Sequence, residues 1–377
     1  MNLFANVHSH LLNFAFIPDD YYKTRVPFSE IFFRNPIIAW LIRMLTWLFP
    51  GSKWDRSHEM LKLFKQNIHQ VAAQHVEEMK AANILFTAPL MMDVELASFG
   101  KKPEIPFVKQ VELISGISLK YAGKFLPFIA VDPRRERAAD MVEEALEEMG
   151  FLGVKFYPPM GYHPSHKSVF NSLTVNEELQ RIYTYCHQNQ VPITAHCSID
   201  CAYGKEFINN PERLVEVTHP GAWRPVLSDF PQLILNFAHF GGDFPDVEKP
   251  ESWSSEILRM IDSNQNVYTD LSYHGVTIDS SNSEQYFWKL SELMDKSPNY
   301  REKILFGTDW PMTRHTLTEA EYITLYIDEL GGQRLEELAY RNVMNFLFPD
   351  RQIPRRILRF YEDSGKILPE YLTDYFG

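Results

Sequence analysis

Eight short apolar runs, most of them followed by a helical pattern, constrain the fold of this chain more than any other sequence feature. The runs occupy residues 6–12, 83–90, 124–132, 153–159, 191–197, 232–239, 266–272 and 303–310. Strands that alternate with helices pair in parallel, because each connection has to cross back over the sheet. Eight such units predict an α/β fold of the (β/α)8 type, a TIM barrel.

Start and stop signals for helices support this alternation. Thr174–Glu177 is a capping box that predicts a helix leading to Gln190. Thr318–Glu321 is a second capping box, and its helix is expected to end before Gly331. The segment 137–149 has an amphipathic pattern that stops at a glycine.

The spacing of the runs is uneven, since roughly seventy residues separate the first from the second. This stretch predicts a helical insertion over residues 11–81, with a helix near 57–81, on the catalytic rim where strand one ends. Segments 335–348 and 355–361 predict extra C-terminal helices. No internal repeat or long linker interrupts the pattern, so residues 1–377 are expected to form a single domain.

An apolar segment at 36–49 lies inside the insertion. It is too short to span a bilayer and carries Arg43 near its middle. We interpret it as a buried helix or a contact in a homo-oligomer, with a lid or a membrane-surface helix as the alternative reading. The segment therefore does not favour membrane contact.

The net charge restricts the kinds of ligand that we expect, and the cysteine content restricts the expected cellular compartment. The net charge of −12 argues against nucleic acid as a ligand, because a nucleic-acid-binding surface must be basic. An anionic small-molecule substrate remains compatible, since a local cation can reverse the field inside a pocket. Three cysteines and no recognisable signal peptide predict a cytoplasmic protein without a disulfide framework.

Side chains that bind metals stand at the ends of four of the runs. His8 and His10 are two residues apart in the first run, so both point to the same face of a strand. His196, His239 and Asp309 each end a further run. Because all strand ends of a barrel meet at one rim, these groups are expected to converge on a divalent metal, with zinc as the expected ion.

The same residues carry a family resemblance. The His-x-His run, the histidines after strands five and six, and Gly307–Pro311 resemble the amidohydrolase superfamily, in particular its amidohydrolase-related branch of hydrolases and non-oxidative decarboxylases. Segments 153–162 and 342–348 also look like stretches of that branch. The resemblance implies a TIM barrel and metal chemistry, and it says little about the substrate.

The resemblance also implies roles for individual residues. In single-metal relatives, the positions matching His8, His10, His196 and Asp309 bind the ion, and the position matching His239 is an acid/base or electrophilic group. In two-metal relatives a carbamylated lysine on strand four bridges the ions, and the histidine after strand six joins the second ion. Lys155 stands on strand four, so a second metal would involve Lys155 and His239. We favour one ion.

Lys155 has three readings. It can snorkel to solvent, it can anchor a substrate carboxylate, or it can carry the bridging carbamate. Its position in an otherwise apolar run requires a partner for the charge. Other expected substrate-binding residues follow strands four, seven and eight: Tyr157, Tyr162, His274 and Trp310.

The leading hypothesis is a hydrolase in which metal-activated water attacks an amide, lactone or ester carbonyl of a small molecule. Asp309 would move the proton, and His239 or the metal would polarise the carbonyl. The alternative within enzymes is non-oxidative decarboxylation of an aromatic or related acid. An alternative of another class is a non-catalytic, metal-bound binding module.

Overall fold

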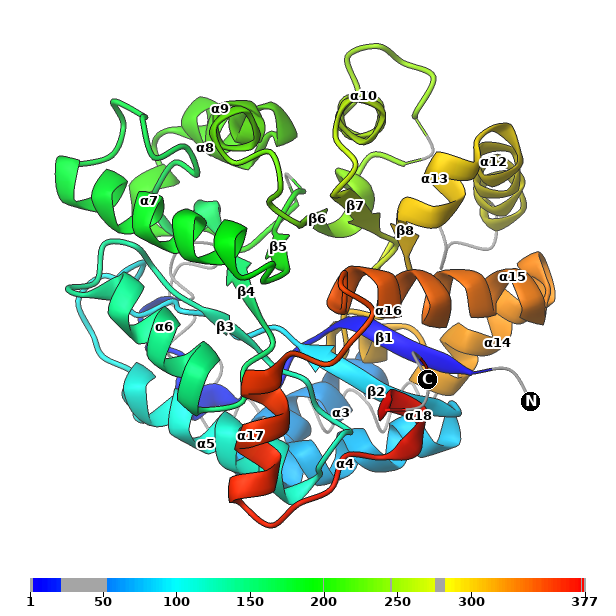
Figure 1. Ribbon diagram of the computed structural model, residues 1–377, viewed down its shortest axis with the longest axis horizontal. Helices are drawn as coiled ribbons and strands as arrows, with labels where there is room; N and C mark the ends of the chain where they lie inside the picture. The colour runs from blue at the N-terminus through cyan, green and yellow to red at the C-terminus, as the bar shows by residue number, and fades with distance from the viewer. Residues whose placement is uncertain are drawn as a thin grey trace.

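The computed structural model describes residues 3–21, 53–198, 200–244, 246–274, 282–373 and 375. Its parallel strands are short and lie at the centre of the molecule, with the helices outside them (Figure 1). The strands are β1 (Phe4–Ser9), β2 (Ile84–Pro89), β3 (Phe128–Ala130), β4 (Gly153–Phe156), β5 (Ile193–Ala195), β6 (Leu235–Phe237), β7 (Val267–Asp270) and β8 (Ile304–Leu305).

Backbone hydrogen bonds join the strands into the barrel that the alternation predicted. Strands β3 to β8 pair in sequence order, and β1 pairs with β2. At one seam Leu126 N–H donates to the Thr87 carbonyl at 2.9 Å. At the other seam Val7 N–H donates to the Phe306 carbonyl at 3.1 Å, beyond the end of β8. The (β/α)8 prediction is confirmed.

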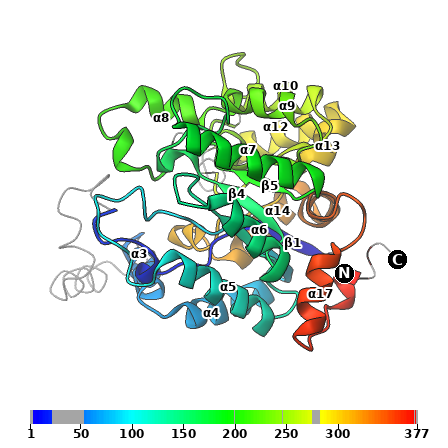
Figure 2. The ribbon, with the colours of Figure 1, turned by 60° about the vertical axis from the view of Figure 1, so that its left-hand side comes forward.

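The helices follow the strands along the chain. They are α3 (Lys53–Phe64), α4 (Ile68–Ala81), α5 (Phe107–Lys120), α6 (Ala138–Glu148), α7 (Leu173–Gln188), α8 (Pro211–Thr218), α9 (Arg224–Asp229), α10 (Trp253–Ser263), α12 (Ser283–Lys296), α13 (Pro298–Lys303), α14 (Glu319–Leu330), α15 (Gly332–Glu336), α16 (Asn342–Leu347), α17 (Arg355–Asp363) and α18 (Glu370–Thr373). Figure 2 shows α4 to α7 along the outside of the strands and α17 beside α6.

Several helix boundaries differ from those predicted. The α7 helix begins one residue earlier than its expected cap, because the Ser172 hydroxyl accepts from Val175 N–H at 3.3 Å and takes the capping role assigned to Thr174. The expected helix near 57–81 is divided into α3 and α4, since Asn67 forms a new capping box at the start of α4. The capping box Thr318–Glu321 starts α14 as predicted.

The strand register places a polar layer inside the barrel. Lys155 pairs with Thr194, and Thr194 pairs with Asn236, so these three side chains share one face of neighbouring strands. The residues beside them, such as Phe156 and Ala195, belong to the apolar core. A barrel interior is usually filled by branched apolar side chains, so a buried polar layer marks a functional region.

Much of the expected insertion, including the apolar segment 36–49, lies outside the described residues. Among the helices that are described, none has both the length and the apolar character needed to cross a membrane.

Candidate metal centre

His8 on β1 and His10 just after it meet an aspartate in the segment that follows β8. His10 Nε2 lies 3.0 Å from Asp309 Oδ1, and His8 Nε2 lies 3.5 Å from the same oxygen. All three residues are buried. They contact one another because β1 adjoins the segment after β8, where Asp309 N–H donates to the His8 carbonyl at 2.8 Å.

The hydrogen bonds of His10 leave an electrostatic conflict with Asp309. His10 Nδ1 lies 2.7 Å from the Leu90 carbonyl, which can only accept, so Nδ1 carries a proton. In a neutral imidazole Nε2 is then a lone pair, and it faces a carboxylate oxygen at 3.0 Å. Two acceptors at this distance require a cation between them, either a proton or a metal ion.

His8 also has an acceptor beside Nδ1 and faces Asp309 with Nε2, and its surroundings indicate whether the cation is a proton or a metal ion. Its Nδ1 lies 2.9 Å from the Ser272 hydroxyl and 3.2 Å from Asp270 Oδ2. Its Nε2 has no hydrogen-bond partner within the described part of the chain, and burial lowers the pKa of the imidazole to about 4. A proton on Nε2 is therefore disfavoured at neutral pH. A divalent cation would bind both Nε2 atoms and the carboxylate at once, so the donor set fits a metal.

The backbone conformation of Asp309 and the imidazoles around it fix the position and the charge of its carboxylate. Its φ angle is +60°, in the left-handed region that side chains other than glycine rarely occupy. Burial raises the pKa of its carboxyl group, but the hydrogen bond with His10 and the imidazoles of His8 and His239 outweigh burial and lower it. Strain of this kind persists where the surrounding structure over-determines it, which is common at functional sites.

His239 lies next to His8. Their ring centroids are 4.8 Å apart, and His239 also has a φ angle of +63°. His239 Nδ1 lies 3.0 Å from the Ser272 carbonyl, so that nitrogen is the protonated one. In the neutral imidazole Nε2 is then able to accept a proton.

Asp270 also lies at this centre, although the sequence analysis did not select it as a candidate. With His8 and His239 it forms a second cluster of metal-binding side chains. However, its carboxylate already accepts from the backbone N–H groups of Ser272 and His239, both at 3.1 Å, and from Asn236 Nδ2 at 2.7 Å. These bonds favour a supporting role for Asp270 behind the histidines. The sequence did contain a signal for Asp270, because this residue ends β7, and Asp309 was selected as a candidate for its similar place near the end of a strand.

His196 lies next to the centre without joining either cluster. Its ring centroid is 4.9 Å from that of His239, and its Nε2 lies 3.1 Å from the Ser198 carbonyl. Tyr157 stacks on His196 at 4.3 Å between centroids. Within the described residues, His8, His10 and Asp309 form one group of converging metal-binding atoms, and His8, His239 and Asp270 form another.

Lys155 is a buried cation that no described residue hydrogen-bonds. Its side chain is 1% exposed, and its Nζ makes no hydrogen bond with the described residues. The nitrogen lies 5.8 Å from the centroid of the Tyr157 ring. Burial lowers the pKa of the ammonium group to about 8, although the charges of Asp270 and Asp309 act in the opposite direction. A buried ammonium group of this kind is stabilised by an anionic ligand or by a modification that removes its charge.

The other residues expected to bind substrate are Tyr162, His274 and Trp310, and each has different contacts. The Tyr162 hydroxyl accepts from Tyr157 N–H at 2.8 Å, behind the stacked ring. His274 Nε2 donates to the His239 carbonyl at 2.7 Å. The indole of Trp310 stacks on His75 of α4, with centroids 3.8 Å apart. Trp310 is therefore fully buried against α4, and its part in substrate binding stays a prediction.

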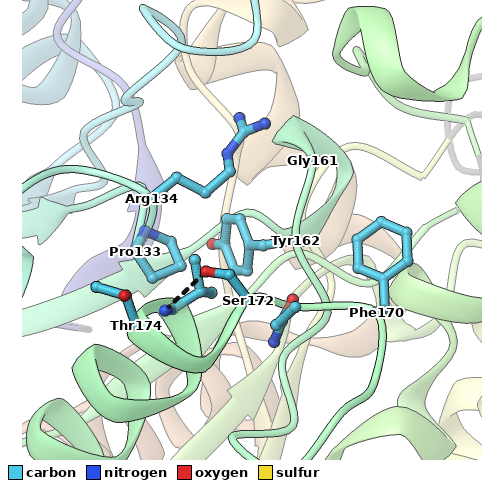
Figure 3. Close-up of a pocket in the computed structure, with 9 residues that line it drawn as sticks. Pro133, Arg134, Gly161, Tyr162, Phe170, Ser172 and Thr174 are labelled. Atoms are coloured by element: carbon cyan, nitrogen blue, oxygen red, sulfur yellow. Dashed lines mark hydrogen bonds between the residues drawn. The ribbon is translucent and has the colours of Figure 1, made fainter.

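A cavity of about 240 Å³ lies beside the start of α7 (Figure 3). Its lining includes Arg134, Tyr162 and Ser172, and none of the residues of the two metal-binding clusters. The Arg134 guanidinium already binds Asp132 and Glu206 at 2.6 Å each. The cavity is therefore separate from the metal-binding side chains.

Comparisons with known proteins agree with this fold. A family model described as amidohydrolase matches residues 66–342. A 5-carboxyvanillate decarboxylase from Novosphingobium aromaticivorans, solved with manganese and 4-hydroxy-3-methoxy-5-nitrobenzoic acid, aligns with a TM-score of 0.58 and 12% identity over 92% of this chain and 96% of that one.

Two further structures give similar alignments. A 2,6-dihydroxybenzoate decarboxylase complexed with 2,6-dihydroxybenzoate aligns with a TM-score of 0.58 and 13% identity over 93% of this chain and all of that one. A putative 2-pyrone-4,6-dicarboxylic acid hydrolase from Pseudomonas putida aligns with a TM-score of 0.51 and 10% identity over 92% and 98%. A search of curated proteins finds no significant match.

Proposed function

Because the chain belongs to the amidohydrolase family, we propose that it is a hydrolase dependent on one divalent metal ion, acting on an amide, lactone or ester carbonyl of a small molecule. The observation that carries the proposal is the contact between His10 Nε2 and Asp309 Oδ1 at 3.0 Å, beside an unprotonated His8 Nε2. Three acceptor atoms converge where only a cation stabilises them together.

The ligands would be His8, His10 and Asp309, with His196 completing the set if its ring turns away from Ser198. Two imidazoles and a carboxylate suit zinc, and also manganese. When bound, such a cation polarises a carbonyl oxygen and lowers the pKa of water to about 7.

The protein's own side chains would then move protons. Asp309 is the carboxylate closest to the imidazole ligands, and its lowered pKa keeps it ionised at neutral pH. It can accept a proton from the attacking water and transfer it to the leaving group. His239 can accept a proton on Nε2 and return it, because its Nδ1 proton is held by the Ser272 carbonyl.

Lys155 would bind a carboxylate of the substrate. A buried ammonium group that makes no hydrogen bond with the described part of the chain gains most from an anion that supplies an acceptor. The nearby Tyr157 ring would form one wall of the same subsite. We therefore propose an anionic substrate despite the net charge of −12.

Non-oxidative decarboxylation is the second candidate, and Lys155 also favours it. A decarboxylase must hold the carboxylate that it removes, and an unmodified ammonium group beside a single metal is suited to that. Two of the structures to which the chain is similar are decarboxylases of aromatic acids. In this reaction a protonated His239 would supply the proton that replaces the carboxylate.

One experiment tests the proposal. The purified protein is analysed for metal and then incubated with lactones, amides and hydroxybenzoate-type acids, each with and without added zinc or manganese. Metal-dependent release of an acid from a lactone or amide supports hydrolysis, and release of CO2 supports the second candidate. Tight metal binding without turnover of either class would favour a non-catalytic binding module.

A further inference from the structure

The Ser272 hydroxyl lies just after β7 and forms a junction with three other polar atoms. Its Oγ is 2.9 Å from His8 Nδ1 and 2.9 Å from His239 Nδ1. It also donates to Asp270 Oδ1. The residue is fully buried. Ser272 thus joins a predicted metal ligand on β1 to a predicted acid/base group after β6.

The protons at this junction can be assigned by counting donors. A hydroxyl group has one proton to donate and two lone pairs to accept with. The ionised carboxylate of Asp270 can only accept, so it takes the proton of Ser272. The hydroxyl oxygen must then accept from both imidazoles, and both Nδ1 atoms must be protonated.

Two independent contacts agree with this assignment. His239 Nδ1 lies 3.0 Å from the Ser272 carbonyl, which cannot donate. His8 Nδ1 lies 3.2 Å from Asp270 Oδ2, which also accepts. Each imidazole therefore has two acceptors at Nδ1, and the hydroxyl is the closer of the two in both cases.

We propose that Ser272 is a positioning residue that fixes His8 and His239 in the same Nδ1-protonated tautomer and couples them through one hydroxyl. This inference rests on the metal-dependent function proposed above, because it concerns how Nε2 of each ring becomes available. For His8 that atom faces Asp309. For His239 it is the atom that would exchange a proton with the substrate.

The packing around Ser272 requires a small residue in the segment that follows β8. A Cβ atom added to Gly307 would lie 2.7 Å from the His8 Cβ and 3.1 Å from the Ser272 Cβ. Glycine at this position lets the segment after β8 approach β1 and β7 closely. The distances from Ser272 to the two imidazoles depend on that approach.

The first test measures the tautomers directly. The metal-free protein, labelled with 15N in histidine, is examined by NMR at pH 7.5, and the His8 and His239 signals are assigned with single His→Gln variants. Both rings are expected to show a protonated Nδ1 and an unprotonated Nε2. An Nε2-protonated His239 in the wild-type protein would overturn the proposal, whatever the behaviour of any variant.

The second test removes the hydroxyl. In Ser272→Ala, the affinity for zinc or manganese measured by calorimetry is expected to fall about 10- to 100-fold, the usual effect of losing a partner behind a metal ligand. The Nδ1 proton signals of both histidines should also shift or broaden. The matched control is Ser118→Ala, which removes another fully buried hydroxyl, bonded to the Phe125 carbonyl and Tyr361.

The outcomes separate this inference from the proposed function. Wild-type metal affinity in Ser272→Ala, or an equal loss in Ser118→Ala, would reject the positioning role. Neither test measures turnover, so a protein that binds metal as expected but hydrolyses nothing would refute the proposed reaction and leave the role of Ser272 intact.

Discussion

Replacing Lys155 with methionine is expected to change the stability of this protein and its binding of an anionic substrate in opposite directions. Methionine keeps a long, flexible side chain and removes the charge. In the metal-free protein the ammonium is buried and makes no hydrogen bond with the described residues, so its charge destabilises the folded state. We expect Lys155→Met to be more stable than the wild type and to lose binding of an anionic substrate.

The size of the effect follows from the pKa of Lys155. A fall from 10.5 to about 8 corresponds to about 3 kcal/mol at 1.36 kcal/mol for each pKa unit. Because the folded-state pKa is lower than the unfolded one, the unfolded chain binds the extra proton between these two values. The penalty is therefore complete below pH 8, and it disappears as the pH rises from 8 towards 10.5.

Urea unfolding of both proteins with a chelator present, at several pH values from 7 to 10, measures this difference. Lys155→Met should exceed the wild type by about 3 kcal/mol at pH 7, and the gap should narrow above pH 8. Comparing the two proteins at each pH cancels the titration of other groups. Lys296→Met, at an exposed position on α12, should show no such gap. A destabilised Lys155→Met, or a gap independent of pH, would refute the reasoning.

Three further predictions concern the centre itself. Replacing both His8 and His10 with alanine should remove most bound metal, as measured by elemental analysis, and unchanged stoichiometry would reject the site. Asp309→Asn should lower turnover of an identified substrate by about 10²- to 10⁴-fold while circular dichroism stays native, and near-normal turnover would exclude a proton-transfer role. His239→Ala should keep one equivalent of metal and lose activity. If metal content falls instead, and mass spectrometry finds a carbamate on Lys155, the single-ion proposal fails.

The order of strands and helices was readable from the sequence because hydrophobic periodicity determines which face of an element is buried. Boundaries were less accurate. The third run was predicted over 124–132, whereas β3 covers only Phe128–Ala130. The residues before it still pair with β2, through a single bridge between Thr87 and Phe125. Extended chain and regular strand have the same side-chain pattern, so periodicity alone could not separate them.

The candidate centre was predictable to the extent that strand ends of a barrel converge. The orientation of side chains beyond those ends was not. Alternation of side chains holds only while the backbone stays extended, and Asp309 interrupts it with a φ angle of +60°. The following residue, Trp310, is thereby free to turn towards His75 in the helix layer. Proton positions, such as those at His8 Nδ1, depend on partners from strands far apart in sequence.

A second layer of hydrogen bonds explains how the strained ligands are held. The Asn6 side-chain oxygen accepts from His8 N–H at 3.0 Å and from Thr308 N–H at 3.1 Å, so one amide fixes the backbone beside two of the proposed ligands. Its nitrogen donates to the buried carboxylate of Glu319 at 3.0 Å.

That carboxylate extends the support into the insertion. His75 Nε2 lies 3.4 Å from Glu319 Oε2, and His75 is on α4, the described helix that ends the insertion. The same imidazole stacks on the residue next to Asp309. A chain of contacts thus runs from α4 to the loop that carries the aspartate. Because a buried polar contact adds little net stability over apolar packing, its value here lies in fixing one arrangement of that loop. The described part of the insertion therefore supports the proposed metal ligands from behind.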